Sequence, residues 1–208
     1  MNKINYQNET DKIINNISEN KVPRLFLHSC CAPCSSYTLE YLSEFFEITV
    51  FYFNPNISPR EEFEKRFSEQ ERLISLLPAK NIITLLKGEY DHSMFLDMAR
   101  GLENVKEGGE RCFKCYRLRL EKTAELASRQ GYDYFCTTLS ISPLKNSQRI
   151  NEIGFEIAEK YGIRWLPSDF KKREGYKRSI ELSREYNLYR QNFCGCIFSK
   201  REAEPENE

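Results

Sequence analysis

The sequence predicts a single α/β domain in which a parallel sheet is covered by helices on both faces. Short apolar runs, rich in β-branched and aromatic residues, alternate along the chain with longer segments of helical periodicity. Strands that are buried on both faces are expected to be nearly continuous apolar runs of this kind. The length of 208 residues suits one well-packed domain, and no internal repeat or linker divides it.

Five segments are predicted to be strands. Arg24–His28 ends immediately before the first cysteines, and Glu47–Phe53 stops at a turn containing Asn54 and Pro55. Three further strands are expected at residues 81–86, 132–139 and 163–166.

Amphipathic segments between these strands predict the helices. Within residues 60–77, for example, Phe63 and Phe67 share one face, and the segment at residues 112–130 stops at Gly131. The expected helices cover residues 37–45, 60–77, 91–99, 112–130, 146–161 and 175–189, with a glycine-containing loop at residues 101–110.

The two ends of the chain are expected to lie outside the α/β domain, which is assigned to residues 23–200. Residues 1–22 are predicted to form a partly flexible extension, and residues 201–208 a polar, frayed tail. The first residues lack the apolar stretch of a secretory signal, and no run approaches the ~20 apolar residues that cross a bilayer. These observations predict a cytoplasmic protein without a membrane partner.

The chain contains eight cysteines but only two histidines. In a reducing cytoplasm this many cysteines indicates metal or redox chemistry, and the scarcity of imidazole argues against a Cys/His zinc finger. The cysteines form three tight groups and one isolated residue. They are Cys30, Cys31 and Cys34; Cys112 and Cys115; Cys194 and Cys196; and Cys136.

Cys30-Cys31-Ala-Pro-Cys34 is the strongest local signal, because three cysteines follow a predicted strand within five residues. In open α/β sheets, sites form beyond the carboxyl ends of the strands. Zinc knuckles usually space their paired cysteines by two to four residues, whereas a multi-iron cluster can accept adjacent thiolates at different irons. Metal binding is therefore favoured over redox thiol chemistry and over simple packing.

Cys112-x-x-Cys115 is expected at the start of a helix, where the helix dipole and the neighbouring Arg111 would lower the pKa of a thiol. Alone, this pair would suit thioredoxin-like exchange or zinc. Together with Cys30 and Cys31 it provides four thiolates, the usual complement of a [4Fe–4S] cluster.

The remaining cysteines are interpreted differently. Cys194-Gly-Cys196 could form a strained, easily reduced disulfide that serves as a redox relay, or it could supply metal ligands. Cys136 lies inside an apolar run and is expected to be a core residue. The loop at residues 140–143, with Lys145 and Asn146, could bind phosphate or a nucleobase, although an ordinary loop is equally consistent.

Charge is unevenly distributed in a chain of zero net charge. Residues 160–202 contain eleven Lys or Arg against five Asp or Glu, which gives +6. This region could present an anion-binding surface, for example one for RNA, although a solvated helix surface explains the charges equally well. The candidate RNA contacts are Lys171, Lys172, Arg173, Lys177 and Arg178.

Taken together, these motifs resemble the QueH-type epoxyqueuosine reductase family, over roughly Leu25 to Ser199. The matching stretches are Leu27-His-Ser-Cys-Cys-Ala-Pro-Cys34, Phe53-Asn-Pro-Asn-Ile57, Glu107-Gly-Gly-Glu-Arg-Cys-Phe-Lys-Cys-Tyr116 with Arg119-Leu120, Thr137-Thr-Leu-Ser-Ile-Ser-Pro143 with Lys145-Asn146, and Phe193-Cys-Gly-Cys196. Both the order and the spacing of these stretches fit the family.

The resemblance implies a Rossmann-like fold related to the PP-loop (HUP-like) ATPases and reduction of the epoxide of epoxyqueuosine in tRNA to give queuosine. It implies that Cys30, Cys31, Cys112 and Cys115 bind a [4Fe–4S] cluster. Cys194 and Cys196 would be a redox-active catalytic pair. At Cys34 some family members carry Asp, near a proposed second metal, so Cys34 is a candidate catalytic residue and ligand of a mononuclear iron or zinc ion.

The implied partners are the anticodon stem-loop of a tRNA that carries epoxyqueuosine and a ferredoxin-like or flavodoxin-like electron donor. Two other classes stay open from the sequence. One is a zinc-containing RNA-binding protein without redox activity. The other is a PP-loop-like, ATP-dependent tRNA-modifying enzyme, although Ser29–Cys34 has no glycine to cradle pyrophosphate.

Overall fold

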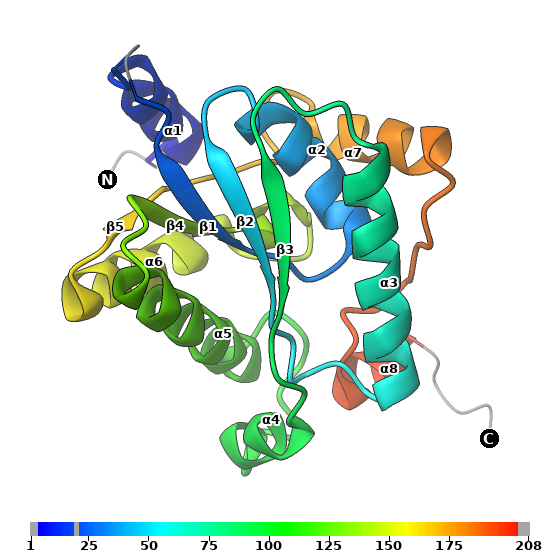
Figure 1. Cartoon of the computed structure of the whole chain (residues 1–208). Helices are drawn as coiled ribbons and strands as arrows, with labels where there is room; N and C mark the ends of the chain where they lie inside the picture. The colour runs from blue at the N-terminus through cyan, green and yellow to red at the C-terminus, as the bar shows by residue number, and fades with distance from the viewer. Residues whose placement is uncertain (1–3, 19–20, 204–208) are drawn as a thin grey trace.

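A computed structural model describes residues 4–18 and 21–203 and contains one five-stranded, entirely parallel sheet (Figure 1). The strand order is β3-β2-β1-β4-β5, so the first strand lies at the centre. The strands are β1 (Arg24–His28), β2 (Glu47–Tyr52), β3 (Ile83–Lys87), β4 (Tyr134–Thr137) and β5 (Arg164–Trp165). All five predicted strands are present.

Helices cover both faces of this sheet, which confirms the predicted Rossmann-like class. In Figure 1, α5 and α6 lie on one side, and α2, α3 and α7 lie on the other. The helices are α1 (Tyr6–Asn15), α2 (Ala32–Leu42), α3 (Arg60–Leu76), α4 (His92–Ala99), α5 (Glu110–Arg129), α6 (Ser147–Tyr161), α7 (Gly175–Glu185) and α8 (Ile197–Ala203).

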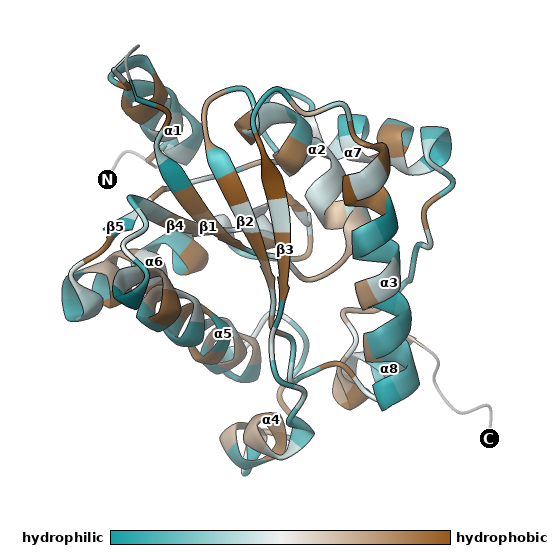
Figure 2. Ribbon diagram, viewed as in Figure 1, coloured by the Kyte–Doolittle hydropathy of each residue, from teal (hydrophilic) through white to brown (hydrophobic). Residues whose placement is uncertain are grey.

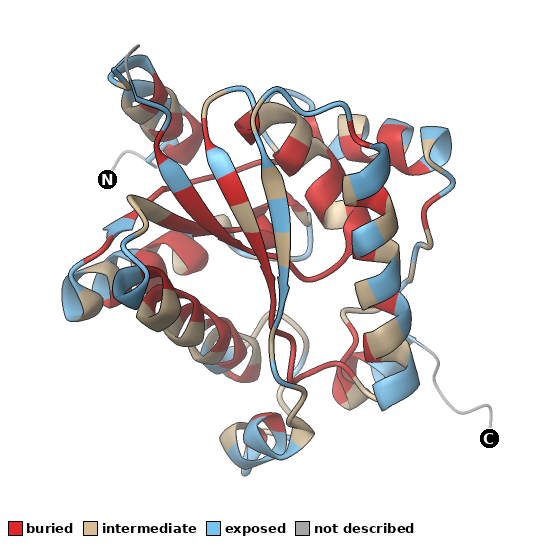
Figure 3. Cartoon of the chain, viewed as in Figure 1, coloured by how far each residue is buried: buried red, intermediate tan, exposed pale blue. Residues whose placement is uncertain are grey.

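The core lies along the central strands. Leu25, Phe26 and Leu27 of β1 are completely buried, and β1 and β2 form a hydrophobic, buried centre in Figures 2 and 3. Leu27 pairs in register with Val50 on one side and with Cys136 on the other. Each fully buried aliphatic or aromatic side chain contributes about 1.5–3 kcal/mol, so this centre fixes the positions of the strand ends.

Some predicted boundaries were wrong, and helix caps explain them. Helix α2 begins at Ala32 rather than at residue 37, because Cys31 has the extended backbone of an N-cap and Pro33 occupies the first turn. The strand predicted to reach residue 139 ends at Thr137, and a 3₁₀ turn, η1 (Thr138–Ile141), follows it. Helix α7 ends at Glu185, before the left-handed Asn187.

Two helices near the termini were not predicted. Residues 6–15 of the expected extension form α1, where Thr10 Oγ1 donates a hydrogen bond to the carbonyl of Pro167 (2.5 Å). Helix α8 includes residues 201–203 of the expected tail; residues 204–208 lie outside the described part. None of the helices in the described ranges has the length and hydropathy that crossing a bilayer requires.

Candidate active site

A cavity of about 340 Å³ brings together seven of the eight cysteines. It lies where the central strands end, at the carboxyl edge at which open α/β sheets form their sites. All seven candidate site cysteines line it. Cys136 does not: it is completely buried in β4 and its Sγ lies 3.2 Å from the carbonyl oxygen of Leu166, as expected of a core residue.

The loop between β1 and α2 gathers three of these thiols. The Sγ atoms of Cys30, Cys31 and Cys34 all lie within 4.8 Å of one another, and those of Cys30 and Cys31 are 3.8 Å apart. Cys31 caps α2 and Cys34 lies in its first turn, so the start of the helix brings both toward Cys30. The structure thus groups Cys34 with its two neighbours.

Cys112 and Cys115 lie in the first turns of α5, after Gly109 as N-cap. The backbone N–H of Gly108 donates to Cys112 Sγ (3.3 Å). The pKa of each thiol was expected to be lowered, but burial raises the pKa of Cys112 and raises that of Cys115 to about 11. Burial is the largest cause of both shifts.

Arg111 places the expected positive charge beside Cys112 and favours its thiolate, although burial outweighs this effect on the pKa. Its side chain is buried, and its Nη1 donates to the carbonyl oxygens of Leu102 (3.1 Å) and Glu103 (3.0 Å). The guanidinium therefore fixes the loop that precedes α5.

The Cys194–Cys196 segment brings its thiols to the same cavity through an unusual backbone. Gly195 has φ of +112°, a conformation that favours glycine. The two Sγ atoms are 3.6 Å apart, and Ser199 Oγ donates to Cys194 Sγ (3.1 Å). The neighbouring Cys196 thiol holds the pKa of Cys194 well below its usual range, whereas the pKa of Cys196 is raised. Proximity makes a reversible disulfide feasible here.

Buried polar side chains at the ends of the central strands form hydrogen bonds that support the cavity. His28, at the end of β1, donates from Nε2 to the carbonyl of Phe53 (3.1 Å) and accepts at Nδ1 from Thr137 Oγ1 (2.8 Å). Burial lowers the pKa of His28 to about 3, so the ring is neutral. Arg119, also buried, donates to Asn54 Oδ1 (3.4 Å) and lines the cavity. These bonds connect the ends of β1, β2 and β4 with α5.

Lys145, from the loop after η1, reaches the cavity together with residues 142–144. Burial disfavours its charge, but the negative charges of Cys30, Cys34 and Cys194 outweigh that effect and raise the pKa of Lys145. The ammonium therefore stays charged beside the thiols. This loop was predicted only as a possible phosphate or nucleobase site.

Four charged residues of the lining, Arg66, Glu107, Arg119 and Arg190, were not predicted as site residues. A signal for Arg66 was present: Phe63, Arg66 and Leu73 recur at helical spacing and all are buried in α3. The pKa of Glu107 is raised by burial and by the charge of Cys194. No comparable spacing indicated Glu107.

Most of the basic residues proposed for RNA contact are paired with carboxylates. Lys171 Nζ lies 2.9 Å from Asp169 Oδ1, and Arg173 pairs with Asp11. Similarly, Lys177 pairs with Glu174, and Arg178 pairs with Glu40 at 2.5 Å. Lys172 is exposed. These cations do not gather on the cavity lining.

The thiols fit a metal with an affinity for sulfur. Cys30, Cys31 and Cys34 could together hold a metal ion, and thiolates select zinc, copper(I) or iron–sulfur clusters over hard cations. Cys112 and Cys115 lie outside this group of three but line the same cavity. In addition, Arg66 Nη2 is buried there without a hydrogen-bond partner among the described residues, as a donor awaiting a bound group would be.

The fold and the cavity define a Rossmann-like α/β protein with a cysteine-rich candidate metal centre. A model of the family described as epoxyqueuosine reductase QueH matches residues 25–202. The chain belongs to this family, whose members are oxidoreductases.

Individual relatives support the same assignment. The chain is 43% identical over 202 residues to the epoxyqueuosine reductase QueH of Streptococcus pyogenes serotype M1, covering 96% of this chain and 79% of the relative. It is 43% identical to that of Staphylococcus epidermidis, over 95% of this chain and 85% of the relative. It is 35% identical to that of Thermotoga maritima, over 84% and 89% respectively.

Proposed function

We propose that this chain is an epoxyqueuosine reductase that removes the epoxide oxygen of epoxyqueuosine in tRNA to give queuosine. The observation that carries the proposal is the convergence of seven cysteines, from three separate segments, on one cavity in a member of this family. The reaction breaks both C–O bonds of the epoxide and forms a C=C bond. It consumes two electrons and two protons, and the oxygen leaves as water.

Cys30, Cys31, Cys112 and Cys115 would hold a [4Fe–4S] cluster, and Cys34 would contribute to a site for a mononuclear iron or zinc ion. When bound, the cluster would supply electrons one at a time, and the mononuclear ion would polarise the epoxide as a Lewis acid. The four cluster thiols come from two helix N-termini, at α2 and α5.

The chain's own residues would prepare the cavity for this chemistry. Lys145 and Arg119 place positive charge beside thiols that become negative on binding metal. Arg66 and Arg119 are almost completely buried, so the cavity excludes bulk water around these charges. Cys194 and Cys196 would serve as the redox-active pair, because their sulfurs are close enough to join with a small movement.

The substrate would be the anticodon stem-loop of a tRNA, with the modified base unstacked into the cavity. Electrons would come from a ferredoxin-like or flavodoxin-like protein. Such a reaction belongs in the cytoplasm, where tRNA is modified.

Anaerobic purification, followed by incubation with epoxyqueuosine-containing tRNA and dithionite, tests the proposal. Nucleoside analysis by mass spectrometry should show queuosine, and the protein should contain iron and sulfide. Absence of queuosine with an intact cluster would defeat the proposed activity. Zinc alone, without broad visible absorption, would support the non-redox RNA-binding alternative instead.

The roles assigned to the cysteines can be separated in the same assay. Cys194→Ala should retain its iron and lose turnover, because this residue is placed in the redox pair rather than among the cluster ligands. If Cys194→Ala purifies without iron, the division of the cysteines is wrong.

A further inference from the structure

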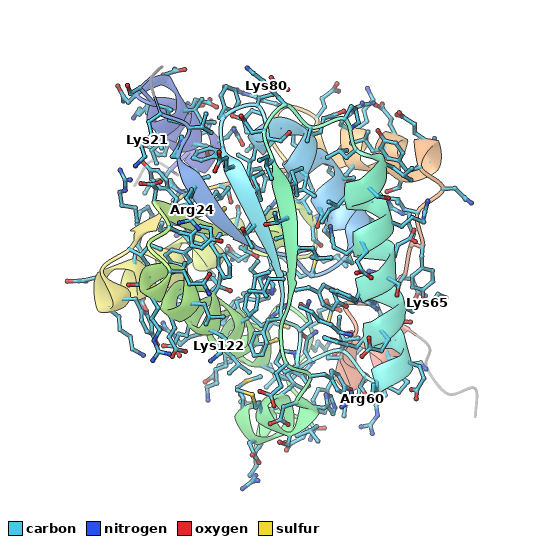
Figure 4. The ribbon with its side chains drawn as sticks, viewed as in Figure 1. Lys21, Arg24, Arg60, Lys65, Lys80 and Lys122 are labelled. Atoms are coloured by element: carbon cyan, nitrogen blue, oxygen red, sulfur yellow. The ribbon has the colours of Figure 1, made fainter. Side chains whose placement is uncertain are left out.

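Arg66 carries a positive charge into the buried side of α3. Its side chain is 1% exposed, whereas the preceding Lys65 lies on the outer surface of the same helix (Figure 4). An arginine this deeply buried is costly unless every N–H group has a partner. The contacts of its nitrogen atoms therefore indicate its role.

Two of these nitrogens are held by the protein. Nε donates to Glu62 Oε1 (2.6 Å), and Tyr189 Oη donates to Glu62 Oε2 (3.1 Å). Nη1 donates to the carbonyl oxygen of Cys194 (3.1 Å). Because a guanidinium is planar and rigid, fixing two nitrogens also fixes the third. That third nitrogen, Nη2, is buried and has no hydrogen-bond partner among the described residues, and the Arg66 side chain lines the cavity.

Arg66 also packs directly against the backbone of the Cys194–Cys196 segment. A Cβ atom built on Gly195 would lie 3.0 Å from Arg66 Nη1 and 2.8 Å from Ile57 Cγ1. On the same side, Ser58 N–H donates to the carbonyl oxygen of Gly195 (3.0 Å). The segment is thus held at two consecutive carbonyl groups, that of Cys194 by Arg66 of α3 and that of Gly195 by Ser58, which precedes α3.

The charge of Arg66 also acts on Cys31. Burial disfavours the guanidinium charge, and the interaction with the Cys31 thiolate is the largest effect that favours it. Arg66 therefore binds the Cys194–Cys196 segment directly and acts by its charge on Cys31, a proposed cluster ligand in the same cavity lining.

We propose that Arg66 is a positioning residue that holds the Cys194–Cys196 pair beside the cluster ligands and places its positive charge next to the group bound at Cys31. The part that concerns the cluster rests on the proposed cofactor. The part that concerns the Cys194–Cys196 segment rests only on contacts within this chain.

Two substitutions separate charge from geometry. Arg66→Gln keeps a side-chain donor but removes the charge, so the midpoint potential of the cluster should become more negative in an EPR-monitored redox titration. Arg66→Lys keeps the charge but loses the planar guanidinium group whose Nη1 binds the carbonyl oxygen of Cys194. Its potential should stay near that of the wild type, while iodoacetamide should alkylate Cys194 several-fold faster, as measured by mass spectrometry.

Arg72→Gln is the matched control. Arg72 lies on the same helix, binds Glu69, and donates to the carbonyl oxygens of Tyr186 and Asn187, but it does not line the cavity. It should leave both the potential and the alkylation rate unchanged. Wild-type values in Arg66→Gln and Arg66→Lys, matching this control, would overturn the proposal.

The alkylation measurement does not require a cluster, so it still tests the anchoring role in a variant that purifies with little iron. In such a variant, an unchanged alkylation rate at Cys194 overturns the proposal and a faster rate supports it. A wild-type protein without iron would instead remove the proposed cofactor and leave the alkylation comparison valid.

Discussion

At the scale of single residues, cysteine spacing predicts where thiols gather but not the charges among them. The strand-end position of Cys30 and the helix-start position of Cys112 were sufficient to predict convergence. Arg66 and Arg119 were not predicted, because an arginine within a helix is normally exposed and only its place on an apolar face indicates otherwise. The burial of Arg119 therefore became evident only from the tertiary structure, whereas the spacing of Arg66 with Phe63 and Leu73 contained a signal that was not used.

Cys112→Ala and Cys136→Ala should differ in their effect on the iron content of the protein. Removing Cys112 takes one thiolate from the proposed cluster, and most of the iron should be lost, as determined by iron and sulfide analysis. Removing the Cys136 thiol leaves a small core cavity away from the cavity lining and should lower the free energy of unfolding by about 1 kcal/mol with iron retained. Equal iron loss in both variants would contradict a specific ligand role for Cys112.

At the scale of secondary-structure elements, hydrophobic periodicity predicted the main strands and helices, but caps and short terminal helices escaped it. Helix α2 was placed five residues too late because Cys31 makes no side-chain cap hydrogen bond, so only Pro33 marked its start. The short helices α1 and α8 are stabilised by contacts with distant parts of the chain, such as that of Thr10 with Pro167. A local pattern does not contain that information.

Replacing Gly154 should weaken the packing of α6 on β5. A Cβ at this position would lie 2.3 Å from Trp165 Cε2, so Gly154→Ala forces a rigid ring to move. Overpacking typically costs about 1–3 kcal/mol, which exceeds the roughly 1 kcal/mol that alanine gains over glycine in a helix. Urea unfolding should show a net loss of stability. Glu159→Ala, at an exposed position of the same helix, should show little change.

Glu69 connects α3 to the segment that follows α7. It accepts hydrogen bonds from Arg72 Nη2 (2.7 Å) and from the backbone N–H of Tyr189 (2.7 Å), and Arg72 is the main cause of its lowered pKa. A carboxylate with a lowered pKa stabilises the folded chain above its unfolded pKa of 4.5, and this contribution is lost as the pH falls through the folded value.

Glu69→Gln should therefore lower the free energy of unfolding by about 1 kcal/mol at pH 7, and the difference from the wild type should shrink below pH 4.5. Urea unfolding across this pH range measures it, with Glu159→Gln as an exposed control. A difference that stays constant with pH would exclude the titration of Glu69 as its cause.

At the scale of the whole molecule, alternation of strands and helices predicted a parallel sheet with both faces covered. It did not predict the strand order, because the pairing of β1 with both β2 and β4 depends on long-range contacts. The distribution of charge on the surface was even harder to predict from the sequence. The net charge of +6 in residues 160–202 indicated an anion-binding surface, yet the structure pairs Arg178 with Glu40, Glu181 and Glu185.

Arg190 is therefore the stronger candidate for contact with tRNA phosphate. It is exposed, lines the cavity, and has no ion-pair partner among the described residues; its Nη1 donates only to Ser183 Oγ (3.1 Å). Each phosphate contact releases condensed counterions, so losing one should reduce the salt dependence of binding by about one unit in the log–log slope. Arg190→Ala should accordingly raise the Kd for tRNA several-fold at low salt and flatten its salt dependence, as fluorescence anisotropy would measure.

Arg178→Ala should instead leave Kd and slope unchanged and lower the free energy of unfolding, because its guanidinium joins α7 to α2. The reverse result would place the tRNA on the outer face of α7 and away from Arg190.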